Sequence, residues 1–408
     1  MKIQARKHDT FWQLSQLFKV PERLLMDSNP GIEPENIKVD EAIHIPGYDQ
    51  IQLKIKEGDS FWRISTLTGV PVGLLSFLNG KGEKEGLRKG ETIIVPHRVS
   101  VPQVPLSNAY DSQSLARDLE RLQSIYPFLS VKTIGKSVLG KPIQELRIGK
   151  GRRKVHINAS FHANEWITSL VLMNLIDMYL LSLGNSFQMR GIDPFSFYNT
   201  IELSVVPMVN PDGVDLVVKG PPMELADQLL KMNEGSTEFF HWKANIRGID
   251  LNNQFPAKWE IEKKRKLPKA PAPRDYPGEA PLTEPEAIVL AELAKENDFD
   301  SVIAFHTQGK EFYWGYEGYE PEHSEIIATE LEKASGYKAI RNVDSHAGYK
   351  DWFIQEFRRP GFTIELGKGI NPLPLSQINQ IIHDVSGLFI ALLNNHSIND
   401  YTSKNKGK

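Results

Sequence analysis

The 408-residue sequence contains no cysteine. This absence excludes disulfide bonds, cysteine-based zinc ribbons and a cysteine nucleophile, so any bound metal must be held by histidine, aspartate or glutamate. The sequence also lacks an excess of charge of either sign, because 48 Lys and Arg residues against 51 Asp and Glu residues give a formal net charge of −3. Nucleic acids and anionic membranes usually require a strongly basic surface, so neither is expected as the main partner.

Long apolar runs are scarce as well. The N-terminal segment MKIQARKHDTFW has no apolar stretch of about 7–15 residues of the kind that a secretory signal needs, so we expect synthesis in the cytoplasm without a secretory route. The longest apolar segment, residues 169–183, is interrupted by Asn174 and Asp177 and is shorter than the roughly 20 residues that cross a bilayer. It predicts a buried helix rather than a membrane span.

The first hundred residues contain an internal repeat. Residues 1–50 align with residues 51–100 at a constant offset of 50 and without gaps. Each copy predicts a short strand, a helix that begins at Phe-Trp after a Thr or Ser cap, a second helix around Leu-Leu, and a closing strand before Pro. Matched pairs include Asp9 and Asp59, Phe11 and Phe61, Trp12 and Trp62, Leu25 and Leu75, Asn29 and Asn79, and Pro46 and Pro96.

The repeated segments resemble a known glycan-binding module. GDSFW at residues 58–62 and GETIIVP at residues 90–96 are similar to LysM domains, as are their counterparts in the first copy. The resemblance implies binding to N-acetylglucosamine-containing glycans such as peptidoglycan or chitin, and two weak sites on one chain gain avidity on a repeating polymer. The alternative is a pair of structural spacers. Under either interpretation we expect Trp12 and Trp62 to lie at least partly in the module cores.

The rest of the chain alternates helical and strand-like segments. This alternation predicts an α/β domain with a mixed, mostly parallel sheet flanked by helices, in which some strands are buried on both faces. The expected helices span residues 112–126, 167–183, 284–296, 324–335 and 374–394, and the expected strands span residues 154–159, 201–206, 301–305 and 361–365. The domain boundaries that we expect are 1–49 and 50–98 for the modules, 99–108 for a Pro-containing linker, 109–398 for the α/β domain and 399–408 for a polar tail.

Residues able to carry metal chemistry follow or interrupt the predicted strands. His162 and Glu165 come after one apolar strand, and His306 ends another. Each alone would more often be structural, but together they form a His₂Glu set, the usual arrangement of a catalytic zinc that leaves a fourth position for water. Glu365 interrupts an apolar strand, where a carboxylate is costly unless it is paired or functional. Near a metal it could take a proton from water and return it to a leaving amine.

A fourth segment completes a family resemblance. WKANIRGIDLNNQFP at residues 242–256 is polar without an amphipathic period, which predicts an active-site loop. The four segments, in this order, resemble the M14 zinc carboxypeptidase family over residues 105–400. The resemblance implies one Zn²⁺ per chain on His162, Glu165 and His306, with Glu365 as the general base. Further agreement comes from VNPDG at 209–213, YPG at 276–278, TEPE at 283–286 and Asp351-Trp352.

Three positions depart from the family pattern. In the family's Asn-Arg pair the arginine grips the terminal carboxylate of the substrate. This sequence retains the asparagine as Asn252 but has Asn253 in place of the arginine, and a neutral amide cannot replace the charged clamp. Val343 occupies the place of a family tyrosine, for which Tyr349 or His346 could substitute. The family arginine that stabilises the oxyanion is replaced by Lys243, with Arg247 nearby, and the sequence leaves open which of the two acts.

Tandem LysM-like modules joined to such a domain resemble bacterial γ-D-glutamyl-diamino acid endopeptidases. These enzymes cut between γ-D-glutamate and diaminopimelate or lysine in peptidoglycan stem peptides. We therefore expect a monomeric zinc metallopeptidase with peptidoglycan glycan and stem peptides as partners. The alternatives are an exopeptidase acting on ordinary peptides and a glycan-binding protein with an inactive peptidase domain. Charged candidates for substrate contacts near Glu365 are Arg341, Asp344, Lys350 and Lys368, although a solvated face explains each of them equally well.

Overall fold

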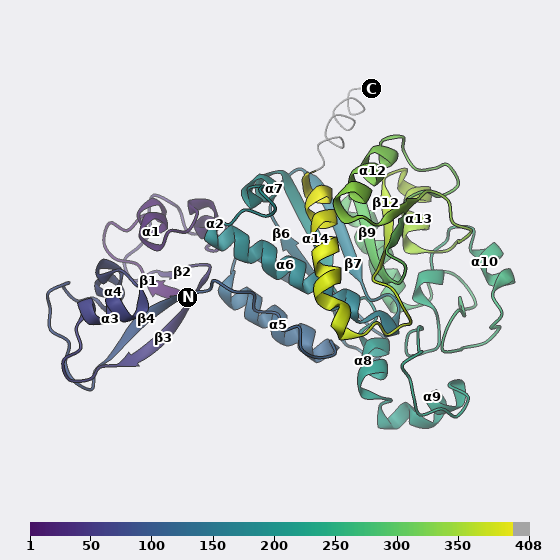
Figure 1. The fold of residues 1–408 in the computed structure, drawn as a ribbon, viewed down its shortest axis with the longest axis horizontal. Coiled ribbons are helices and arrows are strands. Elements are labelled where there is room, and N and C mark those ends of the chain that lie inside the picture. Colours follow the sequence, from purple (N-terminus) through teal and green to yellow (C-terminus); the bar gives the residue numbers. More distant parts are fainter. Residues whose placement is uncertain (395–408) are drawn as a thin grey trace. The chain divides into compact units, whose positions relative to one another are not determined.

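The computed structural model describes residues 1–394, which form two compact units (Figure 1). The first unit comprises residues 1–103, 119–130 and 177–188. The second comprises residues 104–118, 131–176 and the described chain from residue 189 onward. The expected polar tail and the last residues of the expected α/β domain lie outside the described residues.

Each half of the repeat folds as the predicted β-α-α-β module. The two strands of each module pair antiparallel, and Thr10 and Ser60 cap the first helices by accepting a hydrogen bond from the backbone N–H three residues on. The elements of the first module are β1 (Lys2–Gln4), α1 (Phe11–Phe18), α2 (Glu22–Asp27) and β2 (Ala42–His44), and those of the second are β3 (Tyr48–Lys54), α3 (Phe61–Thr68), α4 (Val72–Asn79) and β4 (Thr92–Arg98).

An asparagine at equivalent positions ties the second helix of each module to its closing strand. The side-chain amide of Asn29 donates to the carbonyls of Leu25 and His44, and its oxygen accepts from the backbone N–H of His44. Asn79 makes the same three hydrogen bonds in the second module, to Leu75 and Ile94. The sequence repeat is therefore also a repeat of the same polar contacts.

The paired tryptophans are more exposed than expected. Trp12 is 61% exposed and Trp62 is 73% exposed, so the prediction that they lie partly in the cores was wrong. Each is the second residue of its helix, and in the first module the neighbouring Phe11 and Leu14 fill the core. Because the helical period turns the intervening position away from that face, each tryptophan is directed outward.

The second unit is built on an eight-stranded sheet within the described residues, in the order β11-β10-β12-β9-β7-β8-β6-β5. The four central strands run parallel, whereas β6 and β10 pair antiparallel with their neighbours β8 and β12. This arrangement confirms the mixed, mostly parallel sheet. The central strands are β12 (Gly361–Leu366), β9 (Ser301–Thr307), β7 (Arg153–Ala159) and β8 (Ile201–Val206), and the outer strands are β5 (Ser130–Lys136), β6 (Pro142–Ile148), β10 (Glu311–Tyr313) and β11 (Lys338–Ile340).

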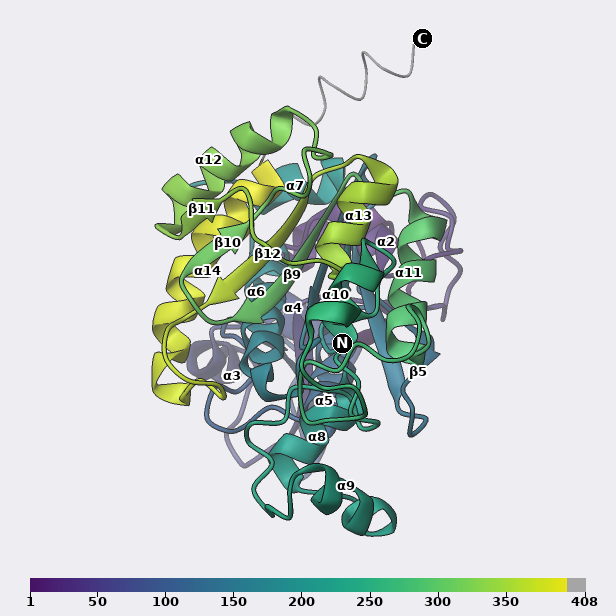
Figure 2. The ribbon, with the colours of Figure 1, turned by 90° about the vertical axis from the view of Figure 1, so that its right-hand side faces the viewer.

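Helices cover both faces of this sheet. Figure 2 shows α6 (Ile167–Asn185) and α14 (Ile378–Asn394) on one side of it and α11 (Pro285–Asn297) and α13 (Tyr349–Phe357) on the other. The segment that contains α6 is long and apolar enough to cross a membrane, but 94% of its apolar window is buried inside the protein, which confirms the predicted buried helix. The other helices are α5 (Ser112–Ile125), α7 (Pro194–Thr200), α8 (Pro211–Lys219), α9 (Ala226–Met232), α10 (Trp259–Arg265) and α12 (His323–Ser335).

The parallel strands bring the candidate metal ligands to one end of the sheet. β7 and β9 are adjacent and parallel, and His162 follows the end of β7 by three residues. β12 places Glu365 directly beside His306 of β9. Ligands commonly bind at the carboxyl ends of strands in open α/β sheets, so the fold gathers these side chains where such sites form.

A fully buried carboxyl group on α11 makes the stability of this unit depend on pH. Glu286 is 0% exposed and accepts hydrogen bonds from the backbone N–H of Val138 and from the side-chain amide of Asn245. Burial is the main cause that raises the pKa of Glu286 to about 7, and the nearby carboxyl groups of Asp212 and Glu284 add to it.

The Glu286→Gln variant is expected to flatten the fall in stability between about pH 5 and pH 8. The protonated carboxyl stabilises the folded state below the unfolded pKa of about 4.3, and this contribution is lost as the pH rises through the folded pKa. The raised pKa corresponds to on the order of 3 kcal/mol. Melting temperatures measured across this pH range test the prediction, with Glu292→Gln on the exposed face of α11 as a control that should follow the wild type. Parallel curves for wild type and Glu286→Gln would contradict it.

Candidate metal centre

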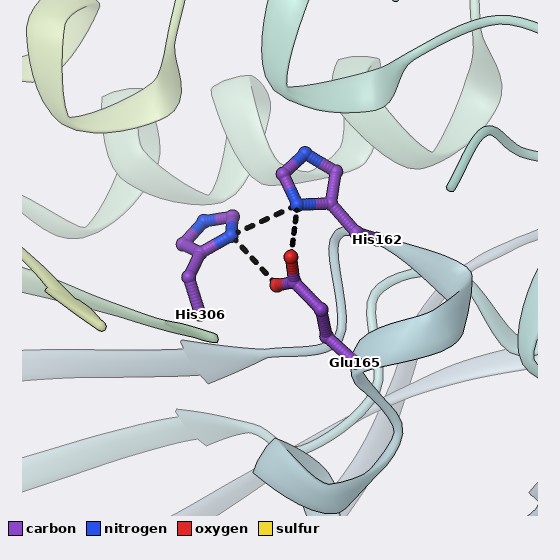
Figure 3. Close-up of side chains that lie close together, drawn as sticks. All are labelled: His162, Glu165 and His306. Carbon is purple, nitrogen blue, oxygen red and sulfur yellow. Dashed lines mark hydrogen bonds and ion pairs between the residues drawn. The ribbon is translucent and has the colours of Figure 1, made fainter. Parts of the chain in front are cut away.

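Two histidines and a glutamate converge at the carboxyl end of the parallel strands (Figure 3). His162 precedes the 3-10 helix η1 (Ala163–Glu165), whose turn brings Glu165 back toward it. The Nδ1 atom of His162 lies 2.9 Å from Oε1 of Glu165, and Nδ1 of His306 lies 3.0 Å from Oε2. The two Nδ1 atoms are 3.1 Å apart, and all three side chains are buried.

These distances suit a tetrahedral zinc ion. Zinc bonds to nitrogen and oxygen of about 2.0–2.1 Å separate two ligand atoms of a tetrahedral ion by about 3.3 Å. An unprotonated Nδ1 is a metal ligand, and a cation shared between His162 and His306 accounts for two such atoms facing each other. The residues present therefore fit zinc, and the structure brings the three predicted ligands together.

Asp250 and Lys243 form a charged pair behind His162. Oδ1 of Asp250 lies 3.3 Å from Nε2 of His162, and Oδ2 lies 3.0 Å from Nζ of Lys243. A carboxylate on the outer nitrogen of a metal-binding histidine fixes the tautomer that leaves Nδ1 for the metal. Burial alone would raise the pKa of Asp250, but the Lys243 ammonium, followed by His162, outweighs burial and holds it well below its usual range. Asp250 is thus kept ionised.

Glu365 lines one cavity of about 380 Å³ together with two of the three ligands, His162 and Glu165. Burial, and then the carboxylate of Glu165, raises the pKa of Glu365 above its ordinary value. Burial opposes the ionisation of Glu165 too, but His162 and His306 outweigh it and lower the pKa of Glu165. Two carboxyl groups with pKa values pushed apart suit two roles, so Glu165 is fitted to bind a metal and Glu365 to exchange a proton.

The structure distinguishes between Lys243 and Arg247, the two cations that the sequence offered for stabilising the oxyanion. Lys243 lines the cavity. Arg247 lies outside it, with a side chain that is 52% exposed and a guanidinium 3.5 Å from the carboxylate of Glu284. Of the two, Lys243 is therefore the one placed to meet charge that develops on a substrate.

The two asparagines at the family clamp position are held in place by hydrogen bonds. Asn252 lines a smaller cavity next to the metal centre, and its side-chain oxygen accepts from the backbone N–H of Tyr349. Asn253 is buried, and its backbone carbonyl accepts a hydrogen bond from the indole N–H of Trp259. No positive charge is present at this position, as the sequence indicated.

Of the other residues predicted to contact substrate, Lys350 lines the smaller cavity, whereas Tyr349, His346, Arg341 and Lys368 line neither cavity. Tyr349 is fully buried and packs against Phe161 and Phe255, so it does not take the place of the family tyrosine in the cavity. The remaining three also lie elsewhere: His346 contacts Tyr316, Arg341 pairs with Glu320, and Lys368 is exposed beside Gln377.

Several cavity residues were missed in the sequence. Asn371 lies with its amide nitrogen 3.5 Å from Oε1 of Glu165, and its oxygen accepts a hydrogen bond from the hydroxyl of Thr307. Tyr313 on β10 and Arg274 on a loop also line the cavity. Their positions depend on strand pairing and loop packing rather than on local patterns, so no sequence signal marked them. Asp250 did stand in the predicted active-site loop, but its contact with His162 was not foreseen.

Comparison with known families agrees with this geometry. The sequence model of the zinc carboxypeptidase family, Peptidase M14, matches residues 115–386. The chain belongs to the M14 zinc carboxypeptidase family. The LysM domain model matches residues 4–46 and 53–96, which are the two β-α-α-β modules. The protein is therefore a metallopeptidase of the M14 family that carries two LysM domains.

Individual relatives of this metallopeptidase cover different shares of the chain. The γ-D-glutamyl-L-diamino acid endopeptidase 1 of Lysinibacillus sphaericus is 53% identical over 393 residues, which are 96% of this chain and 99% of that protein. The uncharacterized protein YqgT of Bacillus subtilis (strain 168) is 49% identical over 285 residues, 68% of this chain and 76% of that protein. The crystal structure of thrombin activatable fibrinolysis inhibitor shares the fold, with a TM-score of 0.57 and 18% identity over 72% of this chain and 75% of that chain.

Proposed function

We propose that this metallopeptidase hydrolyses the bond between γ-D-glutamate and an L-diamino acid in peptidoglycan stem peptides, while its LysM domains hold the glycan. The observation that carries the proposal is the 53% identity over 96% of the chain to an endopeptidase named for that bond. Because this similarity extends through the LysM domains and the catalytic domain together, it supports the same combination of glycan anchor and peptidase.

The neutral clamp position supports a substrate other than an ordinary peptide C-terminus. A terminal carboxylate is gripped most firmly by two parallel hydrogen bonds from an arginine. Asn253 stands at that position here, buried and uncharged, and an amide does not supply those bonds. This supports a peptidase that does not depend on a free carboxylate there.

The cavity residues have different roles in the proposed hydrolysis. Zinc held by His162, Glu165 and His306 would polarise the scissile carbonyl and lower the pKa of water. Glu365 takes a proton from the attacking water and delivers it to the leaving amine, so the C–N bond breaks once the C–O bond has formed. Lys243 places a positive charge beside the oxygen that becomes negative.

Replacing Lys243 with methionine is expected to lower kcat by about 10²–10³-fold, the usual loss when one oxyanion-stabilising group is removed. Lys243→Arg should retain part of the activity, and Arg247→Met should stay near wild type because Arg247 lies outside the cavity. Steady-state kinetics with the zinc content measured on the same samples tests this. Equal losses in Lys243→Met and Arg247→Met, or full activity in Lys243→Met, would contradict the assignment.

Digestion of purified peptidoglycan, followed by mass spectrometry of the soluble and insoluble products, tests the function itself. The proposal expects L-Ala-D-Glu to remain on the glycan and peptides that begin with the diamino acid to be released. Removal of single C-terminal residues would identify an exopeptidase instead. Absence of cleavage together with substoichiometric zinc would favour a glycan-binding protein with an inactive peptidase domain.

A further inference from the structure

The larger cavity is lined by a second permanently cationic side chain besides Lys243. Arg274 lines this cavity, and the Nε atom of its guanidinium lies 3.2 Å from Oδ2 of Asp275. Oδ1 of the same carboxylate lies 3.6 Å from Nζ of Lys243. Because both cationic groups contact one carboxylate, the guanidinium of Arg274 and the ammonium of Lys243 are neighbours at the cavity.

The guanidinium of Arg274 has donors to spare for a ligand. Its side chain is 58% exposed, and within the described residues its one hydrogen bond runs from Nε to Asp275. Asp275 also lies 3.6 Å from the ammonium groups of both Lys243 and Lys266, so it is not a partner of Arg274 alone. The N–H groups on the two terminal nitrogens are therefore left for a ligand, and this fork suits a carboxylate held by two parallel hydrogen bonds.

Backbone hydrogen bonds on both sides of Arg274 hold its loop against the segment that carries Lys243. The carbonyl of Pro273 accepts a hydrogen bond from the backbone N–H of Lys243 at 2.8 Å. The carbonyl of Tyr276 accepts one from the backbone N–H of Asp250, also at 2.8 Å. A side chain on a loop that is fixed on both sides loses less freedom when it binds a ligand than one on an unrestrained loop.

A γ-linked glutamyl residue differs from an ordinary peptide residue in one charged group. In an α-peptide bond the scissile carbonyl is attached directly to Cα, and the residue has no free main-chain carboxylate. In a γ-D-glutamyl bond the scissile carbonyl belongs to the side chain, so the α-carboxylate is free and is separated from that carbonyl by Cα and two methylene groups. With the carbonyl oxygen beside Lys243, the neighbouring cation at the cavity is Arg274. The acidic side chains of the cavity, Glu165 and Glu365, offer no attraction to an anion.

We propose that Arg274 binds the free α-carboxylate of the γ-D-glutamyl residue and thereby recognises the γ-linkage of the scissile bond. This inference rests on the proposed function and adds a residue that contacts the acyl side of the substrate. Glu365 and Lys243 act at the scissile bond itself, whereas Arg274 determines which carbonyl group is presented to them.

Two peptides that differ in one group test the proposal with the full-length, zinc-loaded wild-type protein. Both consist of L-alanine, γ-linked D-glutamate and diaminopimelate, and in the second peptide a carboxamide replaces the α-carboxylate of D-glutamate. Loss of the charge-assisted pair is expected to lower kcat/KM for the amide peptide by about 10- to 100-fold. Equal cleavage of both peptides, or a preference for the amide, would overturn the inference alone, whereas cleavage of neither would overturn the proposed function.

Substitution of Arg274 shows whether this residue causes the preference. Arg274→Met is expected to lower kcat/KM for the acid peptide to the level of the amide peptide, without lowering cleavage of the amide peptide. Arg247→Met is the matched control, since Arg247 is a half-exposed arginine outside the cavity, and it should keep the wild-type ratio. An unchanged preference in Arg274→Met would overturn the inference. Equal losses on both peptides would also overturn it, because they would mean that Arg274 supports the fold or the position of Lys243.

Arg274→Lys keeps the inference testable if Arg274→Met does not fold. Lysine retains the positive charge but cannot form the two parallel hydrogen bonds of a guanidinium. The preference for the acid peptide should therefore fall between those of the wild type and of a protein that does not discriminate. A ratio equal to that of the wild type would overturn the inference.

Discussion

Glu365→Gln is expected to reduce kcat by about 10²–10⁴-fold while one zinc ion per chain remains bound. Glutamine keeps the size and the polar oxygen of the side chain, but it neither accepts the proton of the attacking water nor returns one to the leaving amine. Glu365 is absent from the group of three ligands that converge within the metal centre, so its replacement should leave their geometry intact. Activity on a defined stem peptide and zinc content of the same preparation together measure the effect.

Glu165→Gln is the matched comparison for this experiment. It makes the same chemical change on a carboxyl group of the same cavity, but one that lies 2.9–3.0 Å from both histidine Nδ1 atoms. Glu165→Gln should therefore lose zinc as well as activity. Near-normal turnover in Glu365→Gln, or the same loss of zinc in both variants, would contradict the separation of the two carboxyl groups into proton carrier and ligand.

The fold and the candidate site were predictable where a local hydrophobic pattern carries, or is followed by, a residue with distinctive chemistry. The 50-residue repeat predicted both β-α-α-β modules. The apolar runs predicted the central strands, because a strand that is buried on both faces carries apolar residues along most of its length. His162 and Glu165 were identifiable because they follow such a run, and His306 because it lies near the end of another. The parallel pairing of β7 and β9 then brings the ends of the two strands together. Glu365 was conspicuous because a carboxyl group is rare within an apolar strand.

The features that escaped prediction depend on contacts between distant segments. Tyr313 reaches the cavity because β10 pairs with β12, and Asn371 does so because a loop returns to Glu165. Lys350 was named only among several charged candidates, since the sequence cannot show that its partner is the adjacent Asp351. The outward tryptophans show a different limit. The helical period that places Phe11 and Leu14 in the core turns the position between them outward, and the apolar character of Trp12 suggested burial instead.

Removal of zinc with a chelator is expected to bring hydrolysis down to the uncatalysed background while the protein remains folded. Without the ion, His162, Glu165 and His306 still have one another as hydrogen-bond partners, and Asp250 remains paired with Lys243. Far-UV circular dichroism should therefore change little. Zinc binds the folded state, so its return should raise the melting temperature, by an amount that corresponds to about 4 kcal/mol at a free concentration 1,000 times the dissociation constant.

His306→Ala separates the loss of the ion from the loss of the fold. The variant lacks one of the three ligands, so added zinc should restore neither activity nor the increase in melting temperature that the stripped wild type shows. His383→Ala, a histidine on α14 outside the metal centre, should respond to chelation and zinc return as the wild type does. Recovery of activity in zinc-treated His306→Ala would mean that the ion is held by other groups. Loss of its circular dichroism signal would mean instead that the histidine supports the fold and that the fold, rather than the ion, limits activity.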